Sequence, residues 1–115
     1  MNMDNRTKPI NKNGENSNVK FVLNVLNQNS RSSSWMLNEG NYTIGRLVEH
    51  EIILDDVTVS RNHGEIIIEN ENSKITDNSS TNGIYINDIL IKDSSELNSG
   101  DKIQIGKFLL LFTKV

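Results

Sequence analysis

The sequence predicts an all-β protein, an antiparallel sandwich or barrel of many short strands. Composition is the first reason: the 115 residues include 14 Ile and 18 Asn but no Ala. Ala is the strongest helix former, whereas Ile favours strands and Asn favours turns. The second reason is that short apolar stretches recur along the chain, separated by turn residues and without a 3.6-residue period.

The chain divides near residue 18. Residues 1–18 contain only Met1, Met3 and Ile10 as sizeable apolar side chains. Such a segment buries too little surface to offset the entropy lost on ordering. We therefore expect a disordered tail over 1–18, in which Thr7 is a candidate modification site, and one folded domain over 19–115.

Strand periodicity begins at Val19, where apolar and polar residues alternate as far as Leu26. Turn residues such as Asn82-Gly83 and Ser99-Gly100 then bound further short stretches. The last stretch is apolar on both faces, which is typical of a strand at the centre of a sheet. The further strands are expected at 34–38, 41–45, 51–54, 64–70, 73–77, 84–87, 89–92, 101–105 and 107–114.

Charge and composition exclude several classes of function. The net charge of −3 and the pI near 5.3 disfavour a nucleic-acid binder, which normally carries a basic face. The absence of Cys excludes disulfides and thiolate metal sites. No apolar run approaches the roughly 18 residues that cross a membrane. We expect a cytoplasmic monomer with no cofactor, no metal and no membrane or nucleic-acid partner.

Three polar stretches are not explained by core packing: Thr43–Arg46, Val57–Gly64 and Asp77–Gly83. Arg offers a planar fork of donors for a phosphate or carboxylate, and Ser and Thr hydroxyls add short donors. Asn can donate and accept together, so it can hold a peptide backbone. Val57–Gly64 and Asp77–Gly83 contain no carboxylate except that of Asp77, at the margin of the second of them. An anion site has to avoid nearby carboxylates, so this composition suits anion binding.

Two alternatives can be weighed against anion binding. Ser60, His63 and Asp77 could form a hydrolase triad, but Ser60 and His63 are three residues apart and no Gly-x-Ser-x-Gly turn is present. We therefore expect no enzymatic activity. His50-Glu51 with Asp55-Asp56 could hold a metal, although a solvated acidic loop is the simpler interpretation.

The order of these motifs resembles the forkhead-associated (FHA) domain over roughly residues 20–115. The resemblance rests on five motifs in sequence: Gly45-Arg46, Ser60-Arg61-Asn62-His63, Ser80-Thr81-Asn82-Gly83, Asn87 and Leu97…Gly100-Asp101…Ile105-Gly106. It implies a sandwich of about eleven strands whose loops bind phosphothreonine peptides at one end. Two positions depart from the family pattern, with Gly64 where a small Ala is usual and Ile84 where Thr is frequent.

The resemblance also implies a role for each site residue. Arg46 and Ser60 would contact the phosphate, with Arg61 and Thr81 in support. Asn82 would hold the peptide main chain. The structural support would come from Gly45, His63 and Gly83.

More narrowly, the chain is similar to short actinobacterial FHA regulators of 2-oxoglutarate metabolism. The similar stretches are Leu54–Arg61 and Gly100–Phe108, whereas the tail lacks the paired Thr of those regulators. The expected function is a phosphothreonine-binding module in Ser/Thr kinase signalling, with a kinase or its substrate as partner. The alternative is an FHA scaffold or metabolic-enzyme regulator that binds without phosphate.

Overall fold

A computed structural model describes residues 19–27 and 33–115. The predicted tail, including Thr7, lies outside these residues. The described residues form eleven strands and no helix. This part of the chain therefore contains no helix that is long and apolar enough to cross a membrane. The strands are β1 (Phe21–Val25), β2 (Ser34–Leu37), β3 (Gly40–Gly45), β4 (Ile52–Ile53), β5 (Gly64–Glu69), β6 (Asn72–Asp77), β7 (Ile84–Ile86), β8 (Ile89–Leu90), β9 (Ser94–Glu96), β10 (Lys102–Ile105) and β11 (Phe108–Lys114).

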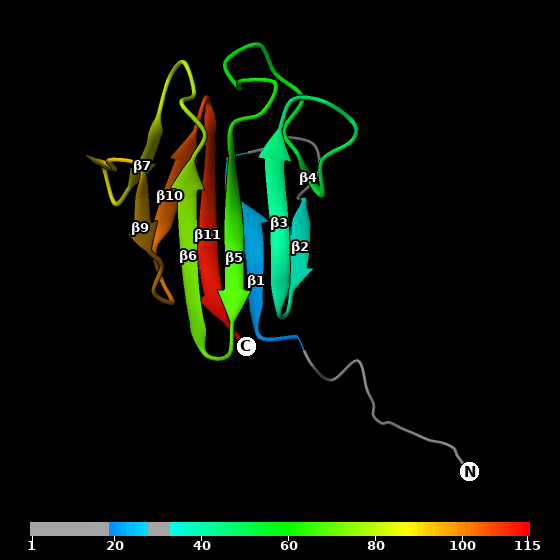
Figure 1. The fold of residues 1–115 in the computed structure, drawn as a ribbon, viewed down its shortest axis with the longest axis vertical. Coiled ribbons are helices and arrows are strands. Elements are labelled where there is room, and N and C mark those ends of the chain that lie inside the picture. Colours follow the sequence, from blue (N-terminus) through cyan, green and yellow to red (C-terminus); the bar gives the residue numbers. More distant parts are fainter. Residues whose placement is uncertain (1–18, 28–32) are drawn as a thin grey trace.

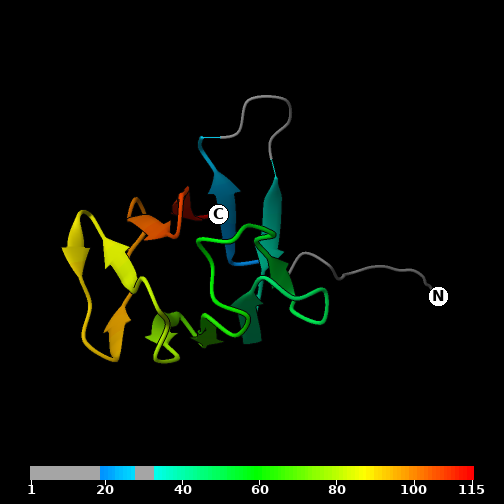
Figure 2. The same ribbon diagram turned by 90° about the horizontal axis from the view of Figure 1, so that it is seen from above.

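The strands form two sheets that face each other as a sandwich, which confirms the predicted fold class (Figures 1 and 2). Sheet A has six strands in the order β2-β1-β11-β10-β7-β8, and sheet B has five in the order β4-β3-β5-β6-β9. Every pairing is antiparallel except β3 with β4, where Ile44 lies beside Ile52 in parallel register.

Strand β11 lies near the centre of sheet A, between β1 and β10, as its two apolar faces predicted. Its inward side chains are buried, and the ring of Phe112 stacks on Phe21 with centroids 4.6 Å apart. Between the sheets lies a single apolar core. The fully enclosed polar residue at its edge is His63, with no exposed surface.

Strand β9 was not predicted, because Ser94–Glu96 contains no apolar residue to mark it. Its backbone pairs with Lys74–Thr76 of β6, and Leu97 directly after it is buried. The strand exists because the edge of β6 offers hydrogen-bonding groups, which side-chain patterns do not report.

Candidate functional site

Four connections meet at one end of the sandwich, and they contain most of the polar residues singled out above (Figure 1). They are the β3–β4 connection (46–51), the β4–β5 connection (54–63), the β6–β7 connection (78–83) and the β10–β11 turn (106–107). Hydrogen bonds join the other three to the β4–β5 connection: the Arg46 amide donates to the Ser60 carbonyl at 3.1 Å, the Asn78 amide to the His63 carbonyl at 2.9 Å, and the Lys107 amide to the Thr58 hydroxyl at 2.9 Å.

Arg46 follows the last residue of β3 and is half-buried. Its Nε–H donates to the Val59 carbonyl oxygen at 3.1 Å, which fixes the plane of the guanidinium. One of five N–H donors is used in this way, and the four on the terminal nitrogens remain. Among the described residues no carboxylate pairs with it, so the guanidinium is available to an anion.

Ser60 links two of the connections. Its Oγ accepts a hydrogen bond from the Thr81 amide at 2.9 Å, and its own amide donates to Nδ1 of His63 at 3.0 Å. A hydroxyl can accept and donate at once. The Ser60 O–H is therefore still free to donate to a bound group.

His63 is buried and links the β4–β5 and β6–β7 connections by hydrogen bonds. Its Nδ1 accepts from Ser60, so the proton of the neutral ring sits on Nε2, which donates to the Gly83 carbonyl at 2.8 Å. Both ring nitrogens are thus bonded to backbone. In addition the His63 amide donates to the Ile44 carbonyl, and its carbonyl accepts from the Asn78 amide.

The same bonds exclude the hydrolase geometry considered above. Nδ1 of His63 is occupied by the backbone amide of Ser60 rather than by its hydroxyl. The Asp77 carboxylate accepts from the Ser80 hydroxyl and makes no contact with the imidazole. A triad requires the ring to bond the nucleophile and the acid in turn, and these three residues form no such chain.

Asn82 and Gly83 close the β6–β7 connection. The side-chain amide of Asn82 donates to the Thr58 carbonyl at 2.9 Å, leaving its Oδ1 and one N–H exposed to solvent. Gly83 has a φ of +80°, a left-handed conformation that costs glycine little. Its amide donates to Oγ of Ser80 at 2.9 Å. Asn82 is therefore held in place before any ligand arrives.

Gly45 makes room for a contact that the sequence did not reveal. A Cβ at this position would lie 2.2 Å from the Arg61 carbonyl oxygen and 2.4 Å from Nε2 of His50. Those two atoms are themselves hydrogen-bonded at 2.6 Å. His50 thus holds the backbone beneath Arg61, whose exposed guanidinium has no partner among the described residues. No local sequence signal distinguishes His50 from a solvated loop residue.

A second unpredicted network lies between Asp56, Thr58 and the β10–β11 turn. The Asp56 carboxylate accepts from the hydroxyl and amide of Thr58 and pairs with Nζ of Lys107 at 3.1 Å. The Thr58 hydrogen bonds, aided by Lys107, lower the pKa of Asp56 to about 2. A Cβ on Gly106 would lie 2.5 Å from Oγ1 of Thr58, so a glycine is required there.

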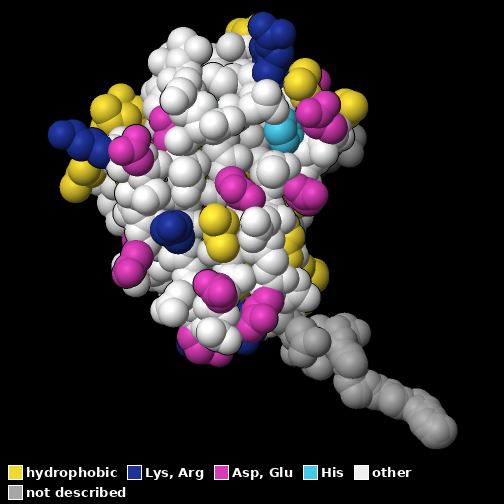
Figure 3. Space-filling view, in the orientation of Figure 1, with side chains coloured by type: hydrophobic (Ala, Val, Ile, Leu, Met, Phe, Trp, Pro, Cys, Tyr) yellow, Lys and Arg dark blue, Asp and Glu magenta, His cyan; other side chains and the backbone are white. Residues whose placement is uncertain are grey.

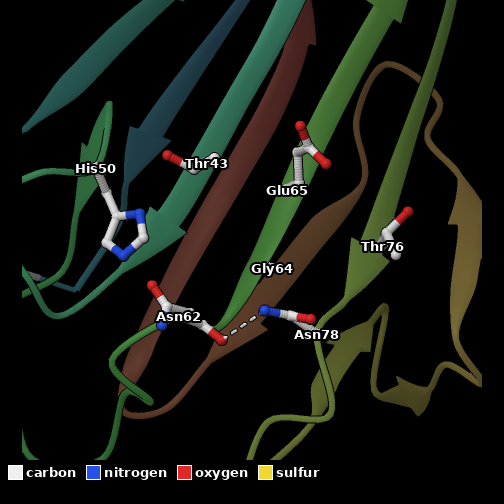
Figure 4. Close-up of a pocket in the computed structure, with 7 residues that line it drawn as sticks. All are labelled: Thr43, His50, Asn62, Gly64, Glu65, Thr76 and Asn78. Atoms are coloured by element: carbon white, nitrogen blue, oxygen red, sulfur yellow. Dashed lines mark hydrogen bonds between the residues drawn. The ribbon is translucent and has the colours of Figure 1, made fainter.

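The polar hollow of Figure 4 lies beside these connections, on the outward side of sheet B. Glu65 stands on one side of it and His50 on the other, and Asn78 donates to the Asn62 carbonyl at 3.4 Å. A carboxylate in the wall makes this hollow unsuitable for phosphate. Among the described residues no group of His, Asp or Glu could hold a metal ion.

The arrangement as a whole can bind a dianion at the loop tips. Two guanidiniums and one free hydroxyl donor stand there without carboxylate partners, whereas Asp56 and Asp77 are both engaged by protein donors. Preorganised charge-assisted donors are the groups that bind phosphate most strongly. The exposed amide of Asn82 adds a group that can bond a peptide backbone.

Comparison with known proteins supports the resemblance to the FHA domain. The family model for the FHA domain matches residues 42–106, which is more than half of the chain. The glycogen accumulation regulator GarA of Mycobacterium tuberculosis is 44% identical over 91 residues, covering 79% of this chain and 56% of GarA. This chain therefore spans little more than half the length of that relative.

The oxoglutarate dehydrogenase inhibitor of Corynebacterium glutamicum is 36% identical over 107 residues, covering 92% of this chain and 74% of the inhibitor. The narrower resemblance to short actinobacterial FHA regulators is thereby confirmed. A solved FHA domain, from work on phosphothreonine-dependent FHA domain interactions, has a TM-score of 0.74 and 29% identity, covering 82% of this chain and 95% of that one. This chain belongs to the FHA domain family.

Proposed function

We propose that this protein is a phosphothreonine-peptide-binding module in Ser/Thr kinase signalling, without catalytic activity of its own. The observation that carries the proposal is Arg46, whose guanidinium is oriented by Val59 and keeps its terminal nitrogens free next to Ser60. The phosphate of phosphothreonine carries about −1.5 to −2 charge at pH 7. Since the whole chain carries −3, attraction must come from local donors of this kind.

In the proposed complex Arg46 and Ser60 contact the phosphate, and Arg61 and Thr81 support it from the adjoining connections. Asn82 bonds the peptide main chain beside the phosphothreonine. The partner is a phosphorylated Ser/Thr kinase or its substrate, and the protein acts in the cytoplasm as a monomer. The solved FHA domain studied for phosphothreonine-dependent interactions supports this proposal.

The names of two relatives favour a second candidate, regulation of a metabolic enzyme, and we consider the form of it in which binding needs no phosphate. These relatives are a glycogen accumulation regulator and an oxoglutarate dehydrogenase inhibitor. In that case the free donors at the loop tips would have no function. The unpaired guanidinium of Arg46 therefore favours the phosphate-dependent proposal.

The experiment is a calorimetric titration with a phosphothreonine peptide chosen from an oriented library. The unphosphorylated peptide of the same sequence and the peptide with phosphoserine in place of phosphothreonine are titrated in parallel. Removing one partner of a hydrogen-bonded charge pair costs roughly 2–5 kcal/mol. Because micromolar affinity corresponds to about −8 kcal/mol, Arg46→Ala should raise the dissociation constant to roughly tens of micromolar at least, and to several millimolar at the upper end of that cost.

Lys74→Ala is the matched control, because Lys74 is an exposed cation on β6 away from the loop tips. It should leave the affinity unchanged. Equal affinity for the phosphorylated and unphosphorylated peptides, or an unchanged affinity in Arg46→Ala, would overturn the proposal in favour of the phosphate-independent candidate.

A further inference from the structure

Asn82 and Gly83 form an Asn-Gly pair, the sequence in which Asn loses its side-chain nitrogen most readily. The backbone nitrogen of the following residue attacks Cγ of the Asn, and Gly has no side chain to shield that nitrogen. The N–Cγ bond forms as the Cγ–Nδ2 bond breaks, and ammonia leaves with the proton of the backbone amide. Water then opens the cyclic imide to Asp or isoaspartate. The product carries a carboxylate in place of the amide.

The folded chain uses both residues of this pair. Gly83 has a φ of +80°, a conformation that strains residues with a Cβ. The side chain of Asn82 joins two connections through its bond to the Thr58 carbonyl. Asn82 is exposed, and in Figure 3 the end of the molecule that carries the β6–β7 connection is mostly white, the colour of uncharged polar groups and backbone. Water therefore reaches a reactive pair that the fold requires.

Both groups that would react are engaged by other atoms. The Gly83 N–H, whose nitrogen is the attacking atom, donates to Oγ of Ser80 at 2.9 Å. The side-chain amide of Asn82 donates to the Thr58 carbonyl at 2.9 Å. The reaction requires the backbone nitrogen to lose its proton and the side chain to close a ring with it. The bond to Ser80 and the bond to Thr58 therefore both oppose the reaction.

Neighbouring bonds keep these groups in place. The hydroxyl of Ser80 donates to the Asp77 carboxylate, so its oxygen is oriented to accept from Gly83. The Thr81 amide donates to Oγ of Ser60 at 2.9 Å, which fixes the backbone just before the pair. A reaction that needs such bonds to open proceeds only from the fraction of molecules that are locally open.

We propose that Asn82 is a site of spontaneous deamidation and that the Ser80 hydroxyl restrains this reaction in the folded protein. Ser80 is a positioning residue, because it acts through the Gly83 amide. Since two hydrogen bonds oppose the reaction, the folded protein should deamidate about 5 to 150 times more slowly than the same sequence without the fold. This proposal does not rest on the function proposed above.

One consequence does rest on that function. Asn82 lies beside the proposed phosphate contacts, so a carboxylate at this position would repel the phosphate and lose the amide donor. Deamidated protein should therefore bind the phosphothreonine peptide at least about tenfold more weakly.

The test incubates the full chain at neutral pH and follows deamidation by mass spectrometry after proteolysis. Fragment ions separate Asn82 from the second Asn-Gly pair of the chain, Asn13-Gly14. A synthetic peptide with the sequence of residues 78–86, incubated in the same buffer, gives the rate without the fold. We expect the folded protein to be slower by the factor given above. Equal rates in the protein and the peptide would overturn the proposal.

Ser80→Ala should accelerate deamidation of Asn82 about threefold to tenfold, because the Gly83 N–H loses its acceptor. Ser79→Ala is the matched control, since Ser79 is an exposed neighbour that bonds neither residue of the pair. An unchanged rate in Ser80→Ala, or equal acceleration in both variants, would overturn the role of Ser80. Urea unfolding establishes that both variants are folded in the buffer. If Ser80→Ala does not fold, the comparison of wild type with the peptide decides the proposal.

Calorimetry distinguishes this proposal from the proposed function. The deamidated form carries an additional negative charge, so ion exchange separates it from fresh protein. Full affinity of the deamidated form for the phosphothreonine peptide would overturn the consequence for binding. If fresh protein fails to bind the peptide, the proposed function is wrong, whereas the mass-spectrometric rates still decide whether Ser80 protects Asn82.

Discussion

Replacing His63 by Ala tests whether the loop tips are held from inside. His63 has no exposed surface, and its ring bonds the Ser60 amide and the Gly83 carbonyl. The substitution removes both bonds while leaving every proposed phosphate contact in place. It should therefore lower stability and weaken phosphopeptide binding together.

The magnitude follows from the two groups left behind. A buried donor or acceptor without a partner costs about 1–3 kcal/mol, so the Ser60 amide and the Gly83 carbonyl together cost about 2–6 kcal/mol. Water entering the space of the imidazole would move the cost toward the lower end of this range. Domains are stable by only about 5–15 kcal/mol, so the loss is a large fraction of the total.

Urea unfolding followed by Trp fluorescence measures the stability, and calorimetry with the phosphothreonine peptide measures the binding. His50→Ala is the matched control for the stability measurement alone, since His50 makes a single bond to an exposed loop carbonyl but holds the backbone of Arg61 in the site. It should cost about 1 kcal/mol or less. Unchanged stability with abolished binding in His63→Ala would refute this reasoning and make His63 a direct ligand contact. Reduced stability with full affinity would show that the loops do not depend on it.

Three further predictions concern other parts of the site. Asn82→Asp keeps the turn but replaces the amide donor with a negative charge, so calorimetry should find phosphopeptide affinity at least about tenfold weaker, with a stability loss of about 1 kcal/mol from the lost bond to the Thr58 carbonyl; normal binding would reduce Asn82 to a turn residue. Gly45→Ala should cost about 1–3 kcal/mol in urea unfolding and weaken binding, because its Cβ would overlap the Arg61 carbonyl oxygen; wild-type values for both would contradict the packing argument. The ionised Asp56 is favoured in the folded state, so its contribution is present above pH 3.8 and is lost as the pH falls toward about 2. The stability difference between wild type and Asp56→Asn should therefore shrink over that interval, and a difference independent of pH would exclude this role for the carboxylate.

Most of the fold could be predicted because burial leaves a period-2 record in the sequence. Strand β11 has apolar residues on both faces, and it lies inside sheet A for that reason. Strand β9 could not be predicted, because Ser94–Glu96 is held by backbone bonds to β6 and only Leu97 beyond it is buried. Local sequence does not report which strand edge is left open to a later segment.

The candidate site also has a part that could be predicted from the sequence and a part that could not. The residue types available to the site could be predicted from the sequence, because Arg46, Ser60 and Asn82 lie in polar stretches that core packing does not explain. Which of their atoms are free to bind a ligand is known only from the folded structure. It commits Nε of Arg46 to Val59 and both nitrogens of His63 to backbone, and it leaves the terminal guanidinium nitrogens and the Ser60 O–H available. The physical reason is that hydrogen bonds between residues 13 to 24 positions apart depend on how the strands bring the loops together, and no local pattern encodes that arrangement.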